Sequence, residues 1–370
     1  MRIADRGLRI RARRRAASPR RARRAPRPFD FQSAFRSPHS AIIAAALCVI
    51  CSAQAAAAAG SWSPQRSGTL NWLRSVYFLD ENAGWAAGGK GSVLRTADGG
   101  RTWQALPRPT EDVVRDVYFV DRLTGWLVCE ANIFSPRTEV RSYLLKTTDG
   151  GATWSRVLVT GDDAELLLVR VVFTDRAHGW AFGEMGALYH TQDGGGTWAR
   201  RRVPTQRLLL GASFIDAAQG WLVGAGSTIL QTDDGGSRWL GAQTPLSEPT
   251  RINAVSFADA RRGWAVGALG TVLATADGGR TWRRQASGTD ADLADVKFLD
   301  AREGWAVGAL GAIIHTTDGG ESWSGVASGT NHPLERLSFA SRARGWAVGF
   351  GGTIIAYAPP PASAPPKIRN

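Results

Sequence analysis

One dipeptide, Gly-Trp, recurs seven times along the chain at an almost constant interval. Successive tryptophans of this dipeptide are 41, 54, 41, 43, 41 and 41 residues apart, and a phenylalanine stands seven residues before each of them. A period of this length indicates copies of one supersecondary unit that stack on one another. The tryptophans are Trp85, Trp126, Trp180, Trp221, Trp264, Trp305 and Trp346, and the phenylalanines are Phe78, Phe119, Phe173, Phe214, Phe257, Phe298 and Phe339.

A second motif, Thr-x-Asp-Gly-Gly-x-x-Trp, follows Gly-Trp in six of the seven units. Each unit then predicts four short strands: an alternating apolar one such as SVYFLD, one that starts at Gly-Trp, a β-branched one such as TVLAT, and one that begins at the tryptophan of the second motif. A four-stranded unit of about 41 residues has the size of a propeller blade. We therefore predict an all-β fold, a seven-bladed β-propeller with four antiparallel strands in each blade.

The N-terminal end of the repeat region supplies the fourth strand that the last unit lacks. The segment WSPQRSGT at 62–69 matches WRRQASGT at 282–289, and each first tryptophan precedes the next Gly-Trp tryptophan by 23 residues. Trp62 therefore takes the place of the missing seventh tryptophan. Pairing this N-terminal strand with the last three strands closes the ring and leaves no incomplete blade.

The second motif, here called the box, predicts a tight turn between the third and fourth strands of a blade. Its carboxylate accepts hydrogen bonds from backbone N–H groups, and Gly-Gly supplies the positive φ values that the turn requires. A catalytic or metal-binding role is the alternative, but a residue present in nearly every blade serves the blade, whereas a site is built once in a ring. The predicted structural aspartates are Asp98, Asp149, Asp193, Asp234, Asp277 and Asp318.

The net charge of +13 is concentrated in the first 55 residues. That segment contains 13 Arg and no Lys, against Asp5 and Asp30 as its acidic residues. The remainder of the chain is almost neutral, so it lacks the positive field that a nucleic-acid-binding domain requires. We therefore expect no nucleic-acid partner.

Residues 1–59 have the pattern of an arginine-rich leader followed by a secretory signal peptide. A basic region precedes the apolar run at 41–55, and small residues that suit cleavage extend through Ala55–Ala59. We expect an exported protein, periplasmic or extracellular, that does not span a membrane after processing. A retained anchor is the alternative, because the run can be extended to 19 weakly apolar residues.

The processed chain is expected to fold without disulfides. Cys48 and Cys51 lie in the leader, so Cys129 remains as a single thiol. Residues 60–358 are assigned to the propeller, and the proline-rich residues 359–370 to a disordered tail.

These motifs resemble those of the Asp-box (BNR) propellers, and the pairing of F-x-D-x-x-x-G-W-A-V-G with T-x-D-G-G-x-T-W resembles the photosystem II stability/assembly factor family in particular. The resemblance extends over residues 61–357. It implies a seven-bladed propeller without catalytic activity, which binds a partner polypeptide and serves in assembly. Family members in cyanobacteria and chloroplasts are lumenal, and a basic patch is implicated in their binding; similar propellers are exported by bacteria without photosynthesis.

A carbohydrate-active propeller, either a sialidase-like glycosidase or a glycan binder, is the alternative function, because sialidases share the box. A sialidase needs an arginine triad and a tyrosine nucleophile paired with a carboxylate. Tyr77 and Tyr118 precede repeated phenylalanines, Tyr189 and Tyr357 fall in predicted third strands, and Tyr143 falls in a predicted loop. We therefore expect no enzyme activity.

Three insertions interrupt the period, at 129–143, 161–167 and 244–250. The first lies between the second and third strands of a blade, and the others lie between blades. Antiparallel geometry places both kinds of loop on the same face of the ring, at the mouth of the central channel. Variable loops on one face favour a recognition surface, although greater tolerance of insertion there explains them equally well.

The predicted partner-binding residues belong to this face. Trp72 is the one tryptophan outside the repeat and lies just before a first strand, where an aromatic side chain can serve as an interface anchor. Arginines near the starts of first strands are expected to ring the channel mouth, and two more lie in the first insertion. The candidates are Trp72, Arg74, Arg115, Arg137, Arg141, Arg170, Arg251 and Arg336.

The expected partner is a protein or peptide, including a segment of a membrane protein, bound to a monomeric propeller. We expect no cofactor. The histidines of the repeat region fall at different positions within their blades, so we expect no metal site. These histidines are His178, His190, His315 and His332.

Overall fold

The computed structural model describes residues 60–132, 140–157, 159 and 166–360. The chain divides into two units, residues 1–57 and 58–370. The leader with its signal peptide, Arg137, most of the 161–167 insertion and nearly all of the proline-rich tail lie outside the described residues. Within the part that is described, no helix has the length and apolar character needed to cross a membrane.

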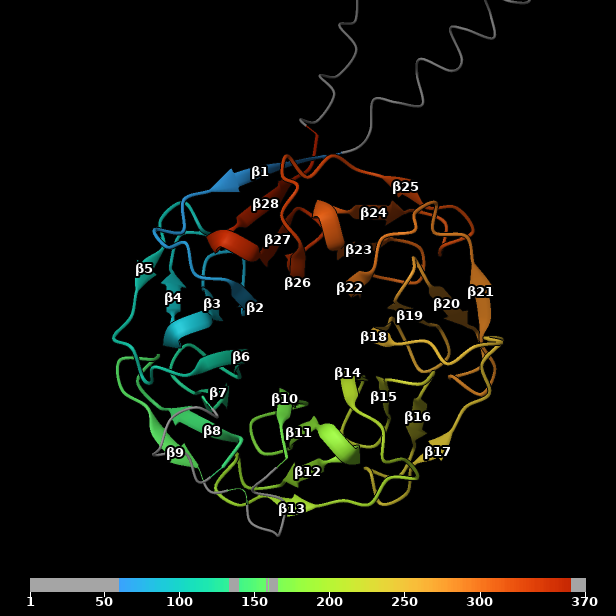
Figure 1. Ribbon diagram of the computed structural model, residues 1–370, viewed down its shortest axis with the longest axis horizontal. Helices are drawn as coiled ribbons and strands as arrows, with labels where there is room; N and C mark the ends of the chain where they lie inside the picture. The colour runs from blue at the N-terminus through green and yellow to red at the C-terminus, as the bar shows by residue number, and fades with distance from the viewer. Residues whose placement is uncertain (1–59, 133–139, 158, 160–165, 361–370) are drawn as a thin grey trace, which may run out of the picture. The chain divides into compact units, whose positions relative to one another are not determined.

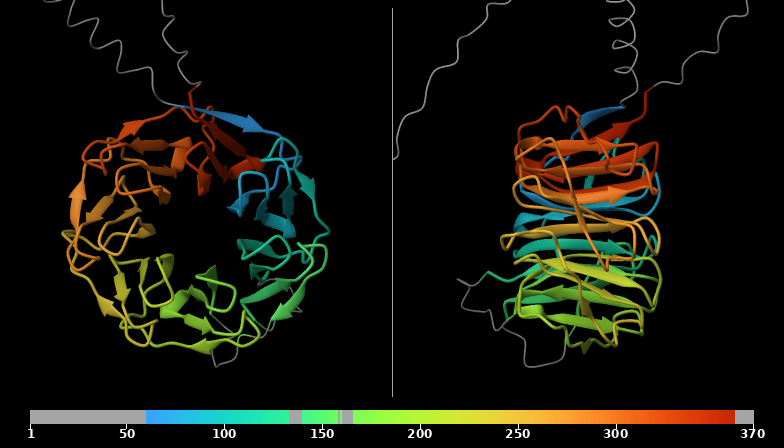
Figure 2. Two further views of the ribbon diagram at one scale, coloured as in Figure 1. Left: turned by 180° about the vertical axis from the view of Figure 1, so that it is seen from behind. Right: turned by 90° about the vertical axis from the view of Figure 1, so that its right-hand side faces the viewer.

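The second unit is a ring of seven four-stranded antiparallel sheets, which confirms the predicted fold class. Figure 1 shows the first strand of every sheet beside the central axis and the fourth strand at the rim. Figure 2 shows from the side that the turns and connections gather on two opposite faces.

The bounds of the strands follow one scheme in all seven blades. The first strands are β2 (Leu73–Phe78), β6 (Val113–Phe119), β10 (Leu168–Phe173), β14 (Leu209–Phe214), β18 (Ile252–Phe257), β22 (Leu293–Phe298) and β26 (Leu334–Ser341). The second strands are β3 (Gly84–Gly88), β7 (Gly125–Glu130), β11 (Gly179–Gly183), β15 (Gly220–Gly224), β19 (Gly263–Gly267), β23 (Gly304–Gly308) and β27 (Arg344–Gly349). The third strands are β4 (Val93–Thr96), β8 (Ser142–Thr147), β12 (Leu188–Thr191), β16 (Ile229–Thr232), β20 (Val272–Thr275), β24 (Ile313–Thr316) and β28 (Ile354–Ala358).

The fourth strands are short, and the described helices are single 3-10 turns between second and third strands. The fourth strands are β5 (Gln104–Ala105), β9 (Ser155–Val157), β13 (Ala199–Arg200), β17 (Leu240–Gly241), β21 (Arg283–Gln285), β25 (Ser324–Gly325) and, for the last blade, β1 (Ser61–Gln65). The 3-10 turns are η1 (Gly89–Gly91), η2 (Glu184–Gly186), η3 (Ala309–Gly311) and η4 (Phe350–Gly352).

The repeated aromatic residues form the contacts between neighbouring blades. The Trp264 indole of the fifth blade stacks on the Phe298 ring of the sixth, with ring centroids 3.5 Å apart. The box tryptophan of the sixth blade, Trp323, then meets the edge of Phe298 at 5.7 Å. Large aromatic side chains contribute buried area and directional ring contacts. The motif residues are therefore framework, as the sequence predicts.

The ring closes by pairing its two ends. β1 runs antiparallel to β28, with Trp62 opposite Tyr357. The Trp62 ring meets the edge of Phe339 with centroids 6.0 Å apart and planes at 86°, which is the geometry of the box tryptophans in the other blades. The prediction that Trp62 replaces the seventh box tryptophan is confirmed.

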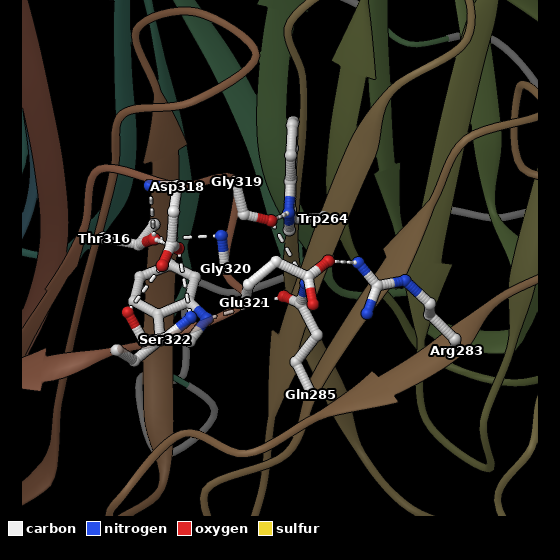
Figure 3. Close-up of polar contacts among 10 residues, drawn as sticks. Trp264, Arg283, Gln285, Thr316, Asp318, Gly319, Gly320, Glu321 and Ser322 are labelled. Carbon is white, nitrogen blue, oxygen red and sulfur yellow. Dashed lines mark hydrogen bonds and ion pairs between the residues drawn. The ribbon is translucent and has the colours of Figure 1, made fainter.

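Each box is a hydrogen-bonded turn, shown for Asp318 in Figure 3. The Ser322 backbone N–H and hydroxyl both donate to the Asp318 carboxylate, at 3.0 and 2.6 Å. The Thr316 hydroxyl donates to the same carboxylate at 2.7 Å and accepts from the Gly320 N–H at 2.9 Å. Gly320 has a φ of 84°, in the left-handed region that favours glycine. The aspartate thus organises the turn between third and fourth strands.

The two faces of the ring carry different connections. On one face the Gly91 N–H donates to the Asp112 carbonyl, so the turn after a second strand lies against the connection to the next blade. On the other face the Gly99 N–H of the box turn donates to the Asn82 carbonyl of the turn after a first strand. We call the first the crossover face and the second the box face.

The first insertion lengthens a hairpin on the crossover face. Cys129 and Glu130 extend β7 and pair with Tyr143 and Ser142 in β8. The expectation that Tyr143 lies in a loop is therefore wrong, because the added residues continue the sheet. The Tyr143 hydroxyl donates to the Asp112 carboxylate at 2.7 Å, and Cys129 is buried as a free thiol.

Candidate functional site

The first strands place residues at fixed positions along the central channel. Residues three and four positions before each repeated phenylalanine come from the beginning of the strand and therefore lie toward the crossover face. In all seven blades the pairing of the first strand is irregular at this point, between the residues five and three positions before the phenylalanine; in the last blade these are Leu334 and Arg336. Such irregularities in pairing change the direction of nearby side chains.

Five of the predicted arginines share one cavity of about 270 Å³ near the crossover face. They come from blades one, two, three, five and seven, so only closure of the ring brings them together. The cavity is lined by Arg74, Arg115, Val169, Arg170, Leu210, Arg251, Asn253, Ala294, Glu335 and Arg336.

Three of these arginines have carboxylate partners, so the cavity is less positive than the arginine count indicates. The Arg115 Nε donates to Glu130 at 2.6 Å, and Arg251 donates to Asp292 at 3.2 Å. The Arg336 guanidinium donates to the Asp116 carboxylate at 2.5 Å. The expectation of a basic ring at the channel mouth is therefore corrected to a ring of mixed charge.

Trp72 and Arg74 form a stacked pair beside the cavity. The Arg74 guanidinium carbon lies 3.8 Å from the centroid of the Trp72 ring, and the edge of Phe350 meets the same ring at 5.3 Å. Trp72 is half-buried by these contacts. Burial lowers the pKa of the Arg74 guanidinium, and the nearby Glu335 opposes this effect. Stacking on an indole leaves the guanidinium N–H groups free to bind another molecule.

Asp116 is the centre of a buried network in the channel. Besides Arg336, it accepts hydrogen bonds from the Ser75 hydroxyl at 2.7 Å and from the Val171 N–H at 3.0 Å. Burial raises the pKa of the Asp116 carboxyl to about 6, and the charge of Arg170 and the Ser75 hydroxyl act in the opposite direction. The network joins blades one, two, three and seven across the axis.

Arg170 faces both buried carboxylates of the channel. Its charge lowers the pKa of Asp116 and of Asp295, in each case against a larger upward effect of burial. Among the described residues it has no ion pair within 4.0 Å, and neither has Arg74. Arg74 and Arg170 are thus the cavity arginines best placed to bind a carboxylate from outside.

The two arginines of the first insertion do not join this group. Arg141 forms an ion pair with Glu184 of η2 at 2.7 Å and lines a separate open pocket with Leu166 and Met185. Arg137 lies outside the described residues. The second insertion is described only at its end, where the Leu167 carbonyl accepts from the Glu184 N–H.

Sequence reasoning missed the channel residues that are not arginine. Asp116 and Asp295 lie three positions before their phenylalanines, and Lys297 lies one position before Phe298. Counting back from each phenylalanine would have marked these positions as channel-lining, because the offset of three that gives Asp116 and Asp295 also gives Arg170 and Arg336 in two other blades.

The box aspartates lie on the opposite face from the arginine cavity. Hydrogen bonds from Ser322 and Thr316 lower the pKa of Asp318 to about 2, and the corresponding bonds lower the pKa of Asp98 to about 2. A carboxylate held in this way stabilises its turn. His178 and His190 stack at 6.1 Å, but in the described part of the chain no three potential ligands gather where a metal ion could be held.

The sequence profile of the family described as "Photosynthesis system II assembly factor YCF48" matches residues 101–204, 198–287, 243–337 and 284–358. The chain belongs to this family. The matched segments overlap and together extend from the first box to the last third strand, so the YCF48 family assignment rests on most of the propeller. Among curated proteins, no sequence matches the chain.

Solved structures share the fold of this YCF48 family member. "YCF48 bound to D1 peptide" superimposes with a TM-score of 0.67 at 20% identity, covering 80% of this chain and 96% of that one. YCF48 from Cyanidioschyzon merolae gives 0.65 at 22% identity, covering 80% and 98%. A GH74 xyloglucanase from Xanthomonas campestris gives 0.62 at 14% identity, covering 83% of this chain and 55% of that one. At these identities the likeness shows the fold alone.

Proposed function

We propose that this protein is an exported, non-catalytic propeller that serves as an assembly scaffold and binds a segment of a partner protein on its crossover face. Membership of the YCF48 family supports assembly work, and a YCF48 structure with a bound D1 peptide supports a polypeptide ligand. The observation that carries the choice of face is the stacked pair of Trp72 and Arg74 beside the arginine cavity.

The chemistry of this face suits a peptide that combines an apolar side chain with a carboxylate. The half-buried Trp72 ring offers an apolar contact, and aromatic anchors next to arginine are typical of the energetic centres of interfaces. Arg74 and Arg170 offer guanidinium groups that form paired hydrogen bonds with a carboxylate. The mixed charge of the cavity favours a short acidic segment over a strongly acidic domain, including a terminal or loop segment of a membrane protein.

Export follows from the signal-like pattern of residues 1–59 and belongs to the same proposal. Mass spectrometry of the protein purified from its host tests it. A mature chain that begins near Ala55–Ala59 and is recovered from the periplasm or medium supports export. A chain that retains residues 1–59 and sediments with membranes contradicts it in favour of an anchored protein.

The binding proposal is tested by crosslinking and mass spectrometry in the host. A Trp72→Ala, Arg74→Ala double variant is expected to keep its unfolding midpoint within a few degrees and to lose crosslinks to the partner segment. Arg302→Ala is the matched control, because Arg302 is exposed on the box face. Equal crosslinking by all three proteins contradicts the choice of face, and hydrolysis of a glycoside by the wild-type protein supports the carbohydrate-active alternative instead.

A further inference from the structure

A second part of the channel lies nearer the box face, beyond the arginines of the proposed partner surface. A cavity of about 380 Å³ extends along the axis past the arginines and the two carboxylates. At its inner end it is lined by the residues one position before each repeated phenylalanine. These residues lie two positions beyond Arg170 or Asp295 along their strands, which is about 7 Å deeper.

Four neighbouring blades present hydrogen-bond donors at this depth. Ser213, Ser256, Lys297 and Ser338 come from blades four, five, six and seven. The Ser256 hydroxyl oxygen accepts the Phe298 N–H at 3.0 Å, and Ser213 and Ser338 accept the equivalent N–H groups of the next blades at the same distance. Since each oxygen is used as an acceptor, its own proton remains to donate. Among the described residues none of these three protons has an acceptor.

The remaining three blades present an aromatic and apolar wall. Tyr77, Tyr118 and Val172 occupy the same depth. The Tyr118 hydroxyl donates to the Phe173 carbonyl at 2.7 Å, and the Tyr77 hydroxyl is hydrogen-bonded to Tyr118. The ring centroids of the two tyrosines lie 4.5 Å apart. Their polar atoms are thus satisfied within the protein, which leaves the rings as the surface offered to a ligand.

Lys297 is the cation at the inner end of the channel. The described channel-lining cations are Arg170, Arg336 and Lys297, against the carboxylates Asp116 and Asp295. Asp116 is bonded to Arg336, and Asp295 accepts from the Val296 and Leu337 backbone N–H groups. No carboxylate of the described residues lies within ion-pair distance of the Lys297 ammonium. The Lys297 side chain is exposed within the channel; the surrounding walls lower the pKa of its ammonium group, and Asp295 opposes this effect.

At the inner end of the channel, the Lys297 ammonium and three serine hydroxyl donors face an aromatic and apolar wall. This arrangement suits a ligand that joins an anionic group to an apolar part. We infer that the inner end of the channel binds a small organic carboxylate, with its anionic group on Lys297 and the serine hydroxyls and its apolar part against Tyr77, Tyr118 and Val172. The ammonium and hydroxyls supply charge-assisted hydrogen bonds, and the rings exclude water from the other side of the ligand. A single negative charge balances the charged residues that line this cavity.

The probe for this site is 4-fluorobenzoate, followed by its fluorine NMR signal as the protein is titrated. We expect a dissociation constant of about 1 mM or tighter for the wild-type protein. Lys297→Met, which keeps the length of the side chain without its charge, is expected to weaken binding roughly tenfold or more. Lys297→Arg is expected to restore most of the binding. Lys90→Met is the matched control, because Lys90 is exposed on η1.

Two further binding measurements test whether the negative charge of the ligand and the inner end of the channel are responsible for binding. The neutral 4-fluorobenzamide is expected to bind the wild-type protein much more weakly than the acid, and this comparison holds even if Lys297→Met fails to fold. The Trp72→Ala, Arg74→Ala variant is expected to bind 4-fluorobenzoate like the wild type, since its residues lie at the other end of the channel. Absence of binding, equal binding of acid and amide, or unchanged binding by folded Lys297→Met overturns the inference.

Discussion

The Trp346 indole stacks on the Phe78 ring with centroids 3.4 Å apart and planes at 5°. The two residues come from the last and the first blade, and the Trp346 Nε1 also donates to the Gly99 carbonyl of the first box at 3.1 Å. The contact is the same as that between Trp264 and Phe298 in the middle of the chain. The joint between the chain ends is therefore built like an ordinary contact between neighbouring blades.

Substitution of Trp62, in the strand that closes the ring, tests whether the joint between the last and first blades contributes to stability as other contacts between blades do. Trp62→Ala is expected to lower the free energy of unfolding by about 3–5 kcal/mol, because the buried indole contacts Phe339 and Trp305. Urea unfolding followed by circular dichroism measures the loss. Arg66→Ala, at an exposed neighbouring position, is the control and is expected to change stability very little. A loss below about 1 kcal/mol for Trp62→Ala means that closure does not depend on the N-terminal strand.

The box aspartate gives a stability term that depends on pH. Asp318→Ala is expected to lower the free energy of unfolding by about 1 kcal/mol near neutral pH, because the turn loses its acceptor. The folded pKa of about 2 lies below the ordinary value of 3.8. The contribution of the ionised carboxylate is therefore complete above pH 3.8 and is lost as the pH falls toward 2.

The measurement compares urea midpoints of wild type and Asp318→Ala from pH 7 down to the lowest pH at which both remain folded. The difference is expected to narrow with acidification. Asp290→Ala is the control, since Asp290 is exposed in a connection between blades. A difference that stays constant with pH argues that the aspartate acts through packing alone.

The hydrogen-bonded pair of Arg336 and Asp116 in the channel gives the free energy of unfolding the opposite dependence on pH. Arg336→Met leaves the Asp116 carboxylate buried without its guanidinium, and we expect a loss of about 3 kcal/mol at pH 8. The folded pKa of Asp116 is already raised to about 6, above its ordinary 3.8, and removal of Arg336 raises it further. Stability therefore falls as the pH rises through this window, since the folded state holds the proton more tightly.

Urea unfolding of Arg336→Met and of the wild type at pH 5 and pH 8 tests this direction of the pH dependence. The loss relative to wild type is expected to be smaller at pH 5, where Asp116 is protonated. Arg344→Met, at an exposed arginine of β27, serves as the control. Equal losses at the two pH values contradict a buried charge as the cause.

Leucine occupies a left-handed backbone position in two turns of the crossover face. Leu310 has a φ of 56° and is 77% exposed. Leu310→Gly is expected to raise the free energy of unfolding by about 1 kcal/mol, because glycine adopts this conformation without strain. Leu240→Gly is the matched control: Leu240 is exposed on β17, and glycine there is expected to destabilise. Thermal unfolding of both variants gives the comparison, and a lower midpoint for Leu310→Gly contradicts the prediction.

Much of the fold could be predicted from the sequence because each repeat unit carries the same motif residues at the same spacing. The constant offset between each phenylalanine and its Gly-Trp tryptophan predicts the number of blades. Each such pair marks one blade, and the tryptophan of one blade packs against the phenylalanine of the next. The spacing from Trp62 to Trp85 predicts closure for the same reason. Tyr143 was misplaced because the repeat contains no information about an insertion, and added residues are free to extend a hairpin.

The candidate site could be predicted only in part. Placing Arg74 and Arg115 near the crossover face needs only the direction of a first strand. The pairing of Arg115 with Glu130, and the place of Lys297 at the inner end of the channel, depend on which side chains meet at the axis. No local sequence pattern predicts these contacts between side chains of different strands.

The sequence by itself determined the blade count, the box turns and the strand that completes the ring, because these follow from short-range spacing and from identical contacts between successive units. Only the tertiary structure decided how the channel charges combine. Arg336 and Asp116 are 220 residues apart and meet because seven first strands converge on one axis. Charge compensation there depends on distances across the ring, and a linear pattern does not contain them.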